Sequence, residues 1–222
     1  MNKLILAVLV FFTSVAVHSQ KTDEKNSFDK IKERLNVGFE SNSQWYLNDD
    51  KTGDFDEDEK LRANSYLRID YQISERFSSG FQLESYMPEP LLNYSRLFDK
   101  EIGLGTFYLN YRTKKLDLTL GYYYAQFGSG LILRAWEDRA LGANNALRGG
   151  KIVYDPTSYL RLTALYGKQR KGFEVSDSNI FGFETQFDIA DALQIERLNT
   201  LQLGLSYVGK QEDYSNETPN PN

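Results

Sequence analysis

The chain has 222 residues, with 26 Lys and Arg, 31 Asp and Glu, one His and no Cys. Its single histidine, His18, lies in an N-terminal apolar stretch that reads as a removable signal, so the mature chain keeps 25 cations, 31 anions and no His. This composition excludes a disulfide framework, a Cys/His metal site and Ser–His or Cys–His catalysis, and the net negative charge argues against nucleic-acid binding.

Residues 1–19 have the pattern of a secretory signal peptide. Lys3 precedes an apolar run from Leu4 to Val17, and Val17 and Ser19 are small enough for cleavage before Gln20. A retained anchor helix is the alternative. The polar residues 20–33 are then predicted to be a periplasmic segment that leads into the rest of the chain.

From residue 34 onward the sequence consists of short runs in which apolar and polar residues alternate. Such alternation predicts β-strands with one apolar and one polar face, because successive side chains on a strand point to opposite sides. Nine runs are predicted, at about Arg34–Tyr46, Leu61–Ile73, Phe77–Met87, Gly105–Arg112, Leu116–Phe127, Arg148–Tyr154, Tyr159–Gly167, Ile180–Ile189 and Thr200–Val208. Most are close to the roughly 9–11 residues that a tilted transmembrane strand needs.

The connections between these runs alternate in length. Three are short, at Ser74–Arg76, Thr113–Lys115 and Asp155–Ser158. Four are long, at Leu47–Lys60, Pro88–Leu104, Gly128–Leu147 and Lys168–Asn179. Short periplasmic turns and long external loops are typical of outer-membrane barrels. The stretch Ala190–Asn199 breaks this alternation, and it is long enough for one helical turn.

We therefore predict an all-β fold, an antiparallel up-and-down transmembrane β-barrel over residues 34–208. A soluble, exported β-sandwich with one wet face is the alternative. About nine strands is an odd number, whereas bacterial single-chain barrels have an even one, and the polar tail 209–222 offers no closing strand. We expect these residues to be the N-terminal part of a longer barrel.

In a barrel the polar faces of the strands point into the lumen. The charged residues expected there include Arg68, Asp70, Glu84, Arg112, Arg161 and Glu184. Both signs of charge are present. The lumen is therefore expected to be crossed by ion pairs rather than to form a strongly ion-selective pore.

An acidic stretch over residues 48–59 loosely fits a calcium-binding loop. Its candidate ligands are Asn48, Asp50, Asp54, Asp56 and Glu59. Position one is Asn rather than Asp, and the flanking runs are strands rather than helices. A solvated external loop is the plain alternative to a weak Ca²⁺ site.

The stretch from Tyr122 to Gly150 combines glycines with a dense set of charged and aromatic side chains. We predict that it folds inward and partly fills the barrel. Its candidate residues, which form either a solute-contacting constriction or a plug held by salt bridges, are Arg134, Trp136, Glu137, Asp138, Arg139 and Arg148. Glu137 and Asp138 are adjacent, so they make a poor pair for glycoside hydrolysis.

The stretches FESNSQWYLNDD, RANSYLRIDYQ, GYYYAQFGSGLILRAWEDRALGANNALRG and LTALYGKQRKGFEVSD carry a further signal. They resemble a family of uncharacterised outer-membrane β-barrel proteins from Bacteroidota, a domain of unknown function. The resemblance covers about residues 35–188 and implies a barrel in the cell outer membrane and a chain longer than this one. It implies no substrate and no active site.

These patterns predict a passive pore or a solute-binding channel. The alternative is a non-transporting barrel that serves as a structural or docking partner for other envelope proteins. We expect contact with outer-membrane lipid, a small polar solute or envelope proteins. We expect no nucleic acid, no catalytic activity and no cofactor beyond the weak Ca²⁺ site.

Overall fold

A computed structural model describes residues 31–51, 54, 56–57, 60–91, 102–139, 142–195 and 201–212. The chain divides into two compact units, residues 1–35 and residues 36–222. Of the first unit, the structure describes only residues 31–35. No helix among the described residues combines the length and the apolar character needed to cross a membrane.

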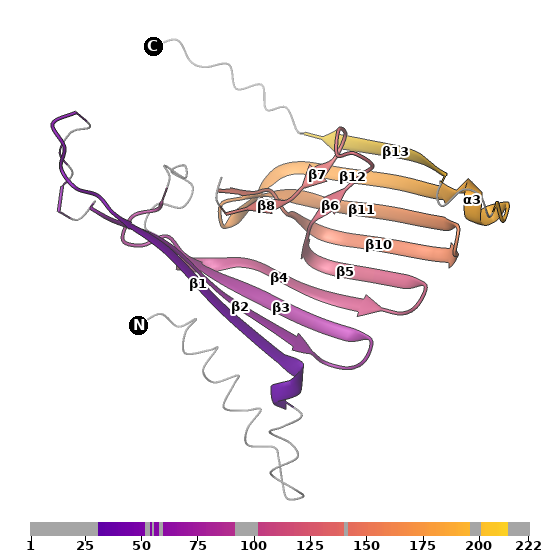
Figure 1. Cartoon of the computed structure of the whole chain (residues 1–222), viewed down its shortest axis with the longest axis horizontal. Helices are drawn as coiled ribbons and strands as arrows, with labels where there is room; N and C mark the ends of the chain where they lie inside the picture. Colours follow the sequence, from indigo (N-terminus) through magenta and orange to yellow (C-terminus); the bar gives the residue numbers. More distant parts are fainter. Residues whose placement is uncertain are drawn as a thin grey trace, which may run out of the picture. The chain divides into compact units, whose positions relative to one another are not determined.

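The second unit is built on one large sheet (Figure 1). Nine strands follow one another across it in chain order, interrupted only between β5 and β10. Their bounds are β1 Leu35–Trp45, β2 Leu61–Gln72, β3 Phe77–Ser85, β4 Ile102–Arg112, β5 Leu116–Tyr123, β10 Leu147–Thr157, β11 Leu160–Lys171, β12 Glu174–Asp188 and β13 Gln202–Gln211. The all-β fold and the nine strands predicted from the sequence are confirmed. The strands β1 and β13 are the two edges of the sheet.

Between β5 and β10 the chain leaves the sheet and forms two short ribbons. The first pairs β6 (Ala125–Gln126) with β7 (Arg134–Ala135), and the second pairs β8 (Glu137–Asp138) with β9 (Ala143–Asn144). We call residues 124–146 the crossing segment. In Figure 1 its ribbons lie in front of the sheet.

The structure tests the sequence interpretation of two connections, the one between β11 and β12 and the one after β12. The predicted long loop at 168–179 is wrong, because β11 and β12 continue to a tight hairpin at Gly172 and Phe173. Gly172 has a φ of 63°, a conformation that suits glycine in a tight hairpin turn. After β12 the chain forms one helical turn, α3 (Ile189–Ala192), whose N-cap Asp188 accepts a hydrogen bond from the Asp191 amide.

The sheet has two ends, which we name by their connections. The turn end carries the connections 73–76, 113–115 and 158–159 between successive strands. The loop end is the opposite one, and it carries the β11–β12 hairpin and both ends of the crossing segment.

Residues paired across neighbouring strands share a face, so the register separates the two faces of the sheet. One row runs through residues that are mostly apolar: Tyr111, Leu118, Ile152, Ala164, Phe183 and Tyr207. The adjacent row runs through Arg112, Asp117, Val153, Thr163, Glu184 and Ser206. We call these the apolar face and the polar face.

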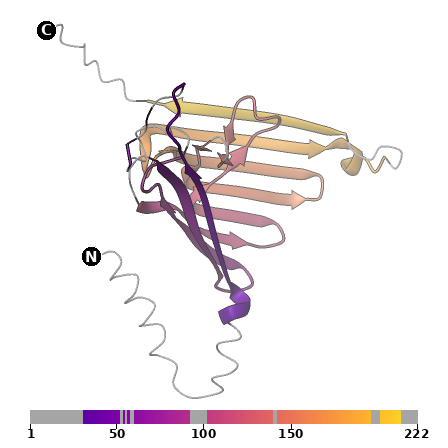
Figure 2. The ribbon, with the colours of Figure 1, turned by 60° about the vertical axis from the view of Figure 1, so that its left-hand side comes forward.

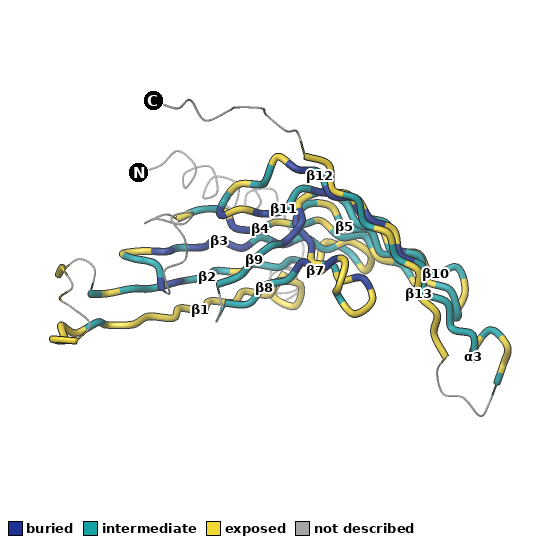
Figure 3. The backbone as a smooth tube through the Cα atoms, turned by 90° about the horizontal axis from the view of Figure 1, so that it is seen from above, coloured by how far each residue is buried: buried dark blue, intermediate teal, exposed yellow. Residues whose placement is uncertain are grey.

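Exposure on the two faces is the reverse of that in a water-soluble protein. On the apolar face Phe183 is 45% exposed, Leu205 70% and Tyr207 62%. On the polar face Glu184 is 4% exposed and Thr163 8%. Figure 3 shows this alternation along the strands, with the edge strand β1 almost wholly exposed. Most of the strand side chains that the fold buries therefore lie on the polar face, although Tyr122 is buried on the apolar face.

Candidate functional site

The crossing segment lies against one face of the sheet (Figure 2). An apolar cluster that includes strand residues of the polar face anchors it there. The members that the segment supplies are Phe127, Leu133 and Ala135. They pack with four residues of the sheet or its flank, Tyr123, Leu147, Leu165 and Ile180. Phe127 lies against Gly182, where an added Cβ would come within 2.8 Å of the phenyl ring. A glycine at this position lets the segment approach the strand closely.

On the β12 side the buried carboxylate of Glu184 holds the segment. Its Oε1 accepts a 2.7 Å hydrogen bond from the backbone amide of Gly128. The carboxylate also accepts hydrogen bonds from Ser206 Oγ at 3.2 Å and from Gln186 Nε2 at 3.0 Å. A buried carboxylate needs such donors to offset its desolvation. Glu184 thus ties the crossing segment to β12 and β13.

On the β1–β3 side Arg139 has the corresponding role. Its guanidinium pairs with Glu40 on β1, donates to Gln82 Oε1 on β3 at 2.9 Å and lies 3.4 Å from Glu137 Oε1. It also stacks over the Tyr66 ring of β2 at 4.2 Å. Arginine suits this role because its planar guanidinium carries several donors and stacks on aromatic rings. The segment is therefore held at both flanks of the sheet.

Within the segment a second set of contacts fixes the two ribbons. The Trp136 amide donates to Asn145 Oδ1 at 2.6 Å, and Asn145 Nδ2 donates to the Arg134 carbonyl at 3.1 Å. The Arg134 guanidinium lies 4.3 Å from the centre of the Trp136 ring. Asn144 Nδ2 donates to Glu137 Oε1 at 3.2 Å. Neighbouring Asp138 pairs in register with Ala143.

A fully buried ion pair lies next to the segment. Arg170 Nη2 donates to Glu84 Oε2 at 2.6 Å, and neither side chain is accessible to solvent. The Tyr86 hydroxyl donates to the same oxygen at 2.7 Å. Burial, reinforced by the nearby Glu84 charge, raises the pKa of Tyr86 well above its usual range, so the phenol stays a donor.

Towards the turn end, three Arg–Asp pairs lie on the polar face. Each arginine Nε donates to its carboxylate, at 2.7 Å in Arg68–Asp70, 2.8 Å in Arg112–Asp117 and 2.8 Å in Arg161–Asp155. All three arginines are more than half exposed. Tyr108 also donates to Asp70, and Asn110 to Asp117. The six lumen candidates from the sequence therefore share one face, with Glu84 and Glu184 buried.

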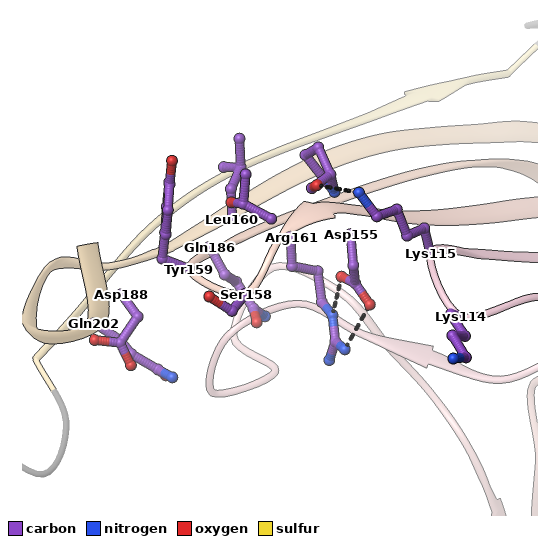
Figure 4. Close-up of a pocket in the computed structure, with 12 residues that line it drawn as sticks. Lys114, Lys115, Asp155, Ser158, Tyr159, Leu160, Arg161, Gln186, Asp188 and Gln202 are labelled. Carbon is purple, nitrogen blue, oxygen red and sulfur yellow. Dashed lines mark hydrogen bonds and ion pairs between the residues drawn. The ribbon is translucent and has the colours of Figure 1, made fainter. Parts of the chain in front are cut away.

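A shallow pocket of about 560 Å³ opens at the turn end (Figure 4). Charged residues that line it are Lys114, Lys115, Asp155, Arg161 and Asp188. Asp155 is paired with Arg161, and Lys115 Nζ donates to the Pro156 carbonyl at 3.0 Å. The pocket offers polar contacts to a solute. None of these groups forms a nucleophile–base pair.

Arg148 is not brought together with the other plug candidates. It belongs to β10, where Leu147 points to the polar face, so Arg148 projects from the apolar face opposite Tyr122 and Lys168. Its guanidinium lies 5.9 Å from the centre of the Tyr122 ring. The placement follows from the alternation of side chains along β10, because Arg148 shares a face with Gly150 and Ile152.

Two important residues of the site were missed. Arg170 lies between Gln169 and Lys171 in a stretch that the sequence assigns to a loop, and no periodicity marks it as buried. Gln82 was recognised only as one of several polar strand residues, although its 4% exposure reflects bonds to Glu84 and Arg139. Contacts between strands that are not neighbours in the sheet leave no sequence signal.

The predicted calcium loop lies partly outside the described residues, since Glu59 is not among them. Asn48, Asp50, Asp54 and Asp56 are described and lie between β1 and β2. Within the described part of the chain, no group of three or more His, Cys, Asp or Glu side chains is arranged to hold a metal ion. The weak Ca²⁺ site stays a prediction.

A family described as a family of unknown function (DUF6029) matches residues 1–222. No curated protein matches the chain. Because the family match covers the full sequence, the chain belongs to the DUF6029 family.

Proposed function

We propose that this chain forms part of the wall of an outer-membrane β-barrel and that the crossing segment narrows the lumen of a passive pore or solute-binding channel. One observation carries the proposal. The row of mainly apolar side chains that includes Ile152, Phe183 and Tyr207 is exposed, whereas Thr163 and Glu184 in the adjacent row on the opposite face are buried.

A bilayer explains the exposed apolar face better than water does. Burying one large apolar side chain contributes about 1.5–3 kcal/mol, so a whole face left in water would forgo a large stabilisation. The soluble-sandwich alternative needs a second layer over this face. Within the described residues the only layer over the sheet is the crossing segment, and it covers the polar face.

Aromatic side chains favour the same placement. Near the turn end Phe77 contacts Tyr111 and Tyr159 contacts Phe187, with ring centres 4.7 and 5.7 Å apart. Towards the loop end, Tyr122 near the end of β5 contacts Phe107, with ring centres 5.4 Å apart. Such rings at both ends of the strands are the pattern of the two aromatic girdles at membrane interfaces.

A sheet that spans a membrane also needs hydrogen-bond partners for the backbone groups of its two edge strands. Backbone groups in hydrocarbon need hydrogen-bond partners, so strands cross a bilayer only as a closed barrel. The proposal therefore includes further strands that pair with β1 and β13. The family resemblance to Bacteroidota barrels supports an outer-membrane location reached through the signal at residues 1–19.

The polar face sets what the lumen can do. At the turn end Arg68, Arg112 and Arg161 are each more than half exposed, so they keep donors available while their carboxylate partners are neutralised. Such a surface suits a small polar solute and gives little selection between cations and anions. The proposal includes no catalytic step, no cofactor and no nucleic acid.

A structural or docking barrel is the second candidate, favoured by the fixation of the crossing segment through Glu184 and Arg139. Planar-bilayer recording with the purified full-length protein separates the two. Stepwise conductance that rises when residues 129–144 are replaced by a short Gly-Ser linker is expected for a narrowed pore. If neither wild type nor the linker variant conducts, while heat-modifiable gel mobility shows that both are folded barrels, the docking role would be supported instead.

A further inference from the structure

Two cations face each other on the apolar side of the sheet. Arg148 of β10 and Lys168 of β11 are direct partners in the register. The pairs that follow on the same face are Gly150 with Tyr166 and Ile152 with Ala164. The two cations therefore mark the loop end of the apolar face, immediately beyond its aromatic and aliphatic residues.

No acidic side chain among the described residues neutralises this pair. Arg148 contacts the Tyr122 ring but no carboxylate, and Lys168 forms no ion pair within the same described ranges. Asp177 lies two residues before Asn179, the register partner of Lys168, and it too forms no ion pair with a described residue. Like charges directly opposite each other destabilise a sheet. The arrangement calls for an anion from outside the chain.

The surroundings define what kind of anion fits. The Tyr166 hydroxyl donates to Asn179 Oδ1 at 2.8 Å, which places a polar group at the same level of the sheet. Aromatic hydroxyls and long basic side chains gather where hydrocarbon gives way to lipid headgroups. The cations also lie on the face opposite the crossing segment, away from any solute in the lumen.

We propose that Arg148 and Lys168 bind the phosphate groups of a phosphorylated lipid in the leaflet at the loop end of the sheet. The proposal rests on the membrane placement argued above. Arginine and lysine both bind phosphate, arginine through paired donors and lysine as a point charge. A lipid phosphate supplies the missing counter-charge at the depth where the apolar face ends.

Binding of lipid A to the full-length protein in zwitterionic detergent tests this site. The variant R148Q/K168Q should bind about thirtyfold more weakly than wild type, which corresponds to about 1 kcal/mol for each cation near a lipid surface. The control K32Q/R76Q removes one lysine and one arginine from exposed positions outside β10, β11 and the pocket lining, and it should bind like wild type.

Lipid A stripped of its phosphates should bind all three proteins equally weakly, and inorganic phosphate should not reproduce the effect. Equal lipid A affinity for wild type and R148Q/K168Q would overturn the lipid site, as would equal affinity for the dephosphorylated lipid or saturation by inorganic phosphate alone. Failure of wild type to float with liposomes would overturn the membrane proposal as well. If wild type floats with liposomes but shows no preference for phosphorylated lipid A, only the lipid site would be overturned.

Discussion

The Arg170 guanidinium meets the Glu84 carboxylate at 2.6 Å, although three strands of the sheet separate β11 from β3. The sheet must therefore curve strongly towards its polar face at the loop end. A second contact agrees, because Phe173 of the β11–β12 hairpin lies 6.0 Å from Tyr86 between ring centres. Curvature of this kind is what closure of a sheet around a lumen requires.

Removing one partner of this buried ion pair should lower the unfolding free energy strongly. In E84Q the Arg170 charge loses its counter-ion in a site without solvent, so we expect a loss of about 3–5 kcal/mol in unfolding free energy. Denaturant unfolding of the full chain in detergent micelles measures this. The control D155N breaks the exposed Arg161 pair and should cost at most about 1 kcal/mol. Equal losses in the two variants would contradict the buried pair.

Arg139 should govern how firmly the crossing segment is held. In R139Q the contacts to Glu40 and Gln82 weaken, and we expect amides of residues 134–146 to exchange at least about tenfold faster, a change of about 1.4 kcal/mol in opening free energy. Hydrogen-exchange mass spectrometry checks this. The control R134Q removes the stacking of the exposed Arg134 guanidinium on Trp136, which is a contact within the segment and not a link to the sheet. Amide exchange in R134Q should therefore stay near wild type. Unchanged exchange in R139Q would remove Arg139 from this role.

Two phenylalanines on opposite sides of the sheet, Phe127 in the crossing segment and Phe183 on the apolar face, should lose different amounts of stability when they are truncated. Phe127 is 2% exposed in the cluster under the crossing segment, so F127A should lose about 3–5 kcal/mol of unfolding free energy. Phe183 is 45% exposed on the apolar face, and F183A should lose less than about 1.5 kcal/mol in detergent, the lower limit for a fully buried side chain. Thermal unfolding followed by gel mobility compares them. A larger loss in F183A would mean that the core lies on the other face.

Periodicity alone was enough to predict the strands and the division of their side chains between two faces. The alternation in Leu116–Tyr123 or Leu160–Tyr166 needs no tertiary information, because a period of two follows from strand geometry. The crossing segment was also predictable in outline. Its glycines and its charged and aromatic residues indicated a structured segment rather than an open loop.

The partners of the site residues could not be predicted. Arg170 reaches Glu84 because a register shift after Lys168 re-aims the end of β11 and because the sheet curves. Neither event has a signature in the sequence. Arg148 was misassigned because it was grouped with the crossing segment, although the alternation along β10 places it on the same face as Ile152.

The central claim is that the apolar face meets lipid, and the neighbouring residues Ile152 and Val153 test it most directly. The chain has no cysteine, so I152C and V153C can each carry a single spin label in the full-length protein in phospholipid vesicles. A label at 152 should collide mainly with oxygen, which concentrates in hydrocarbon, and a label at 153 should not. A label at 152 that is reached by neither oxygen nor a water-soluble nickel chelate, or preferentially by the chelate, would contradict the account.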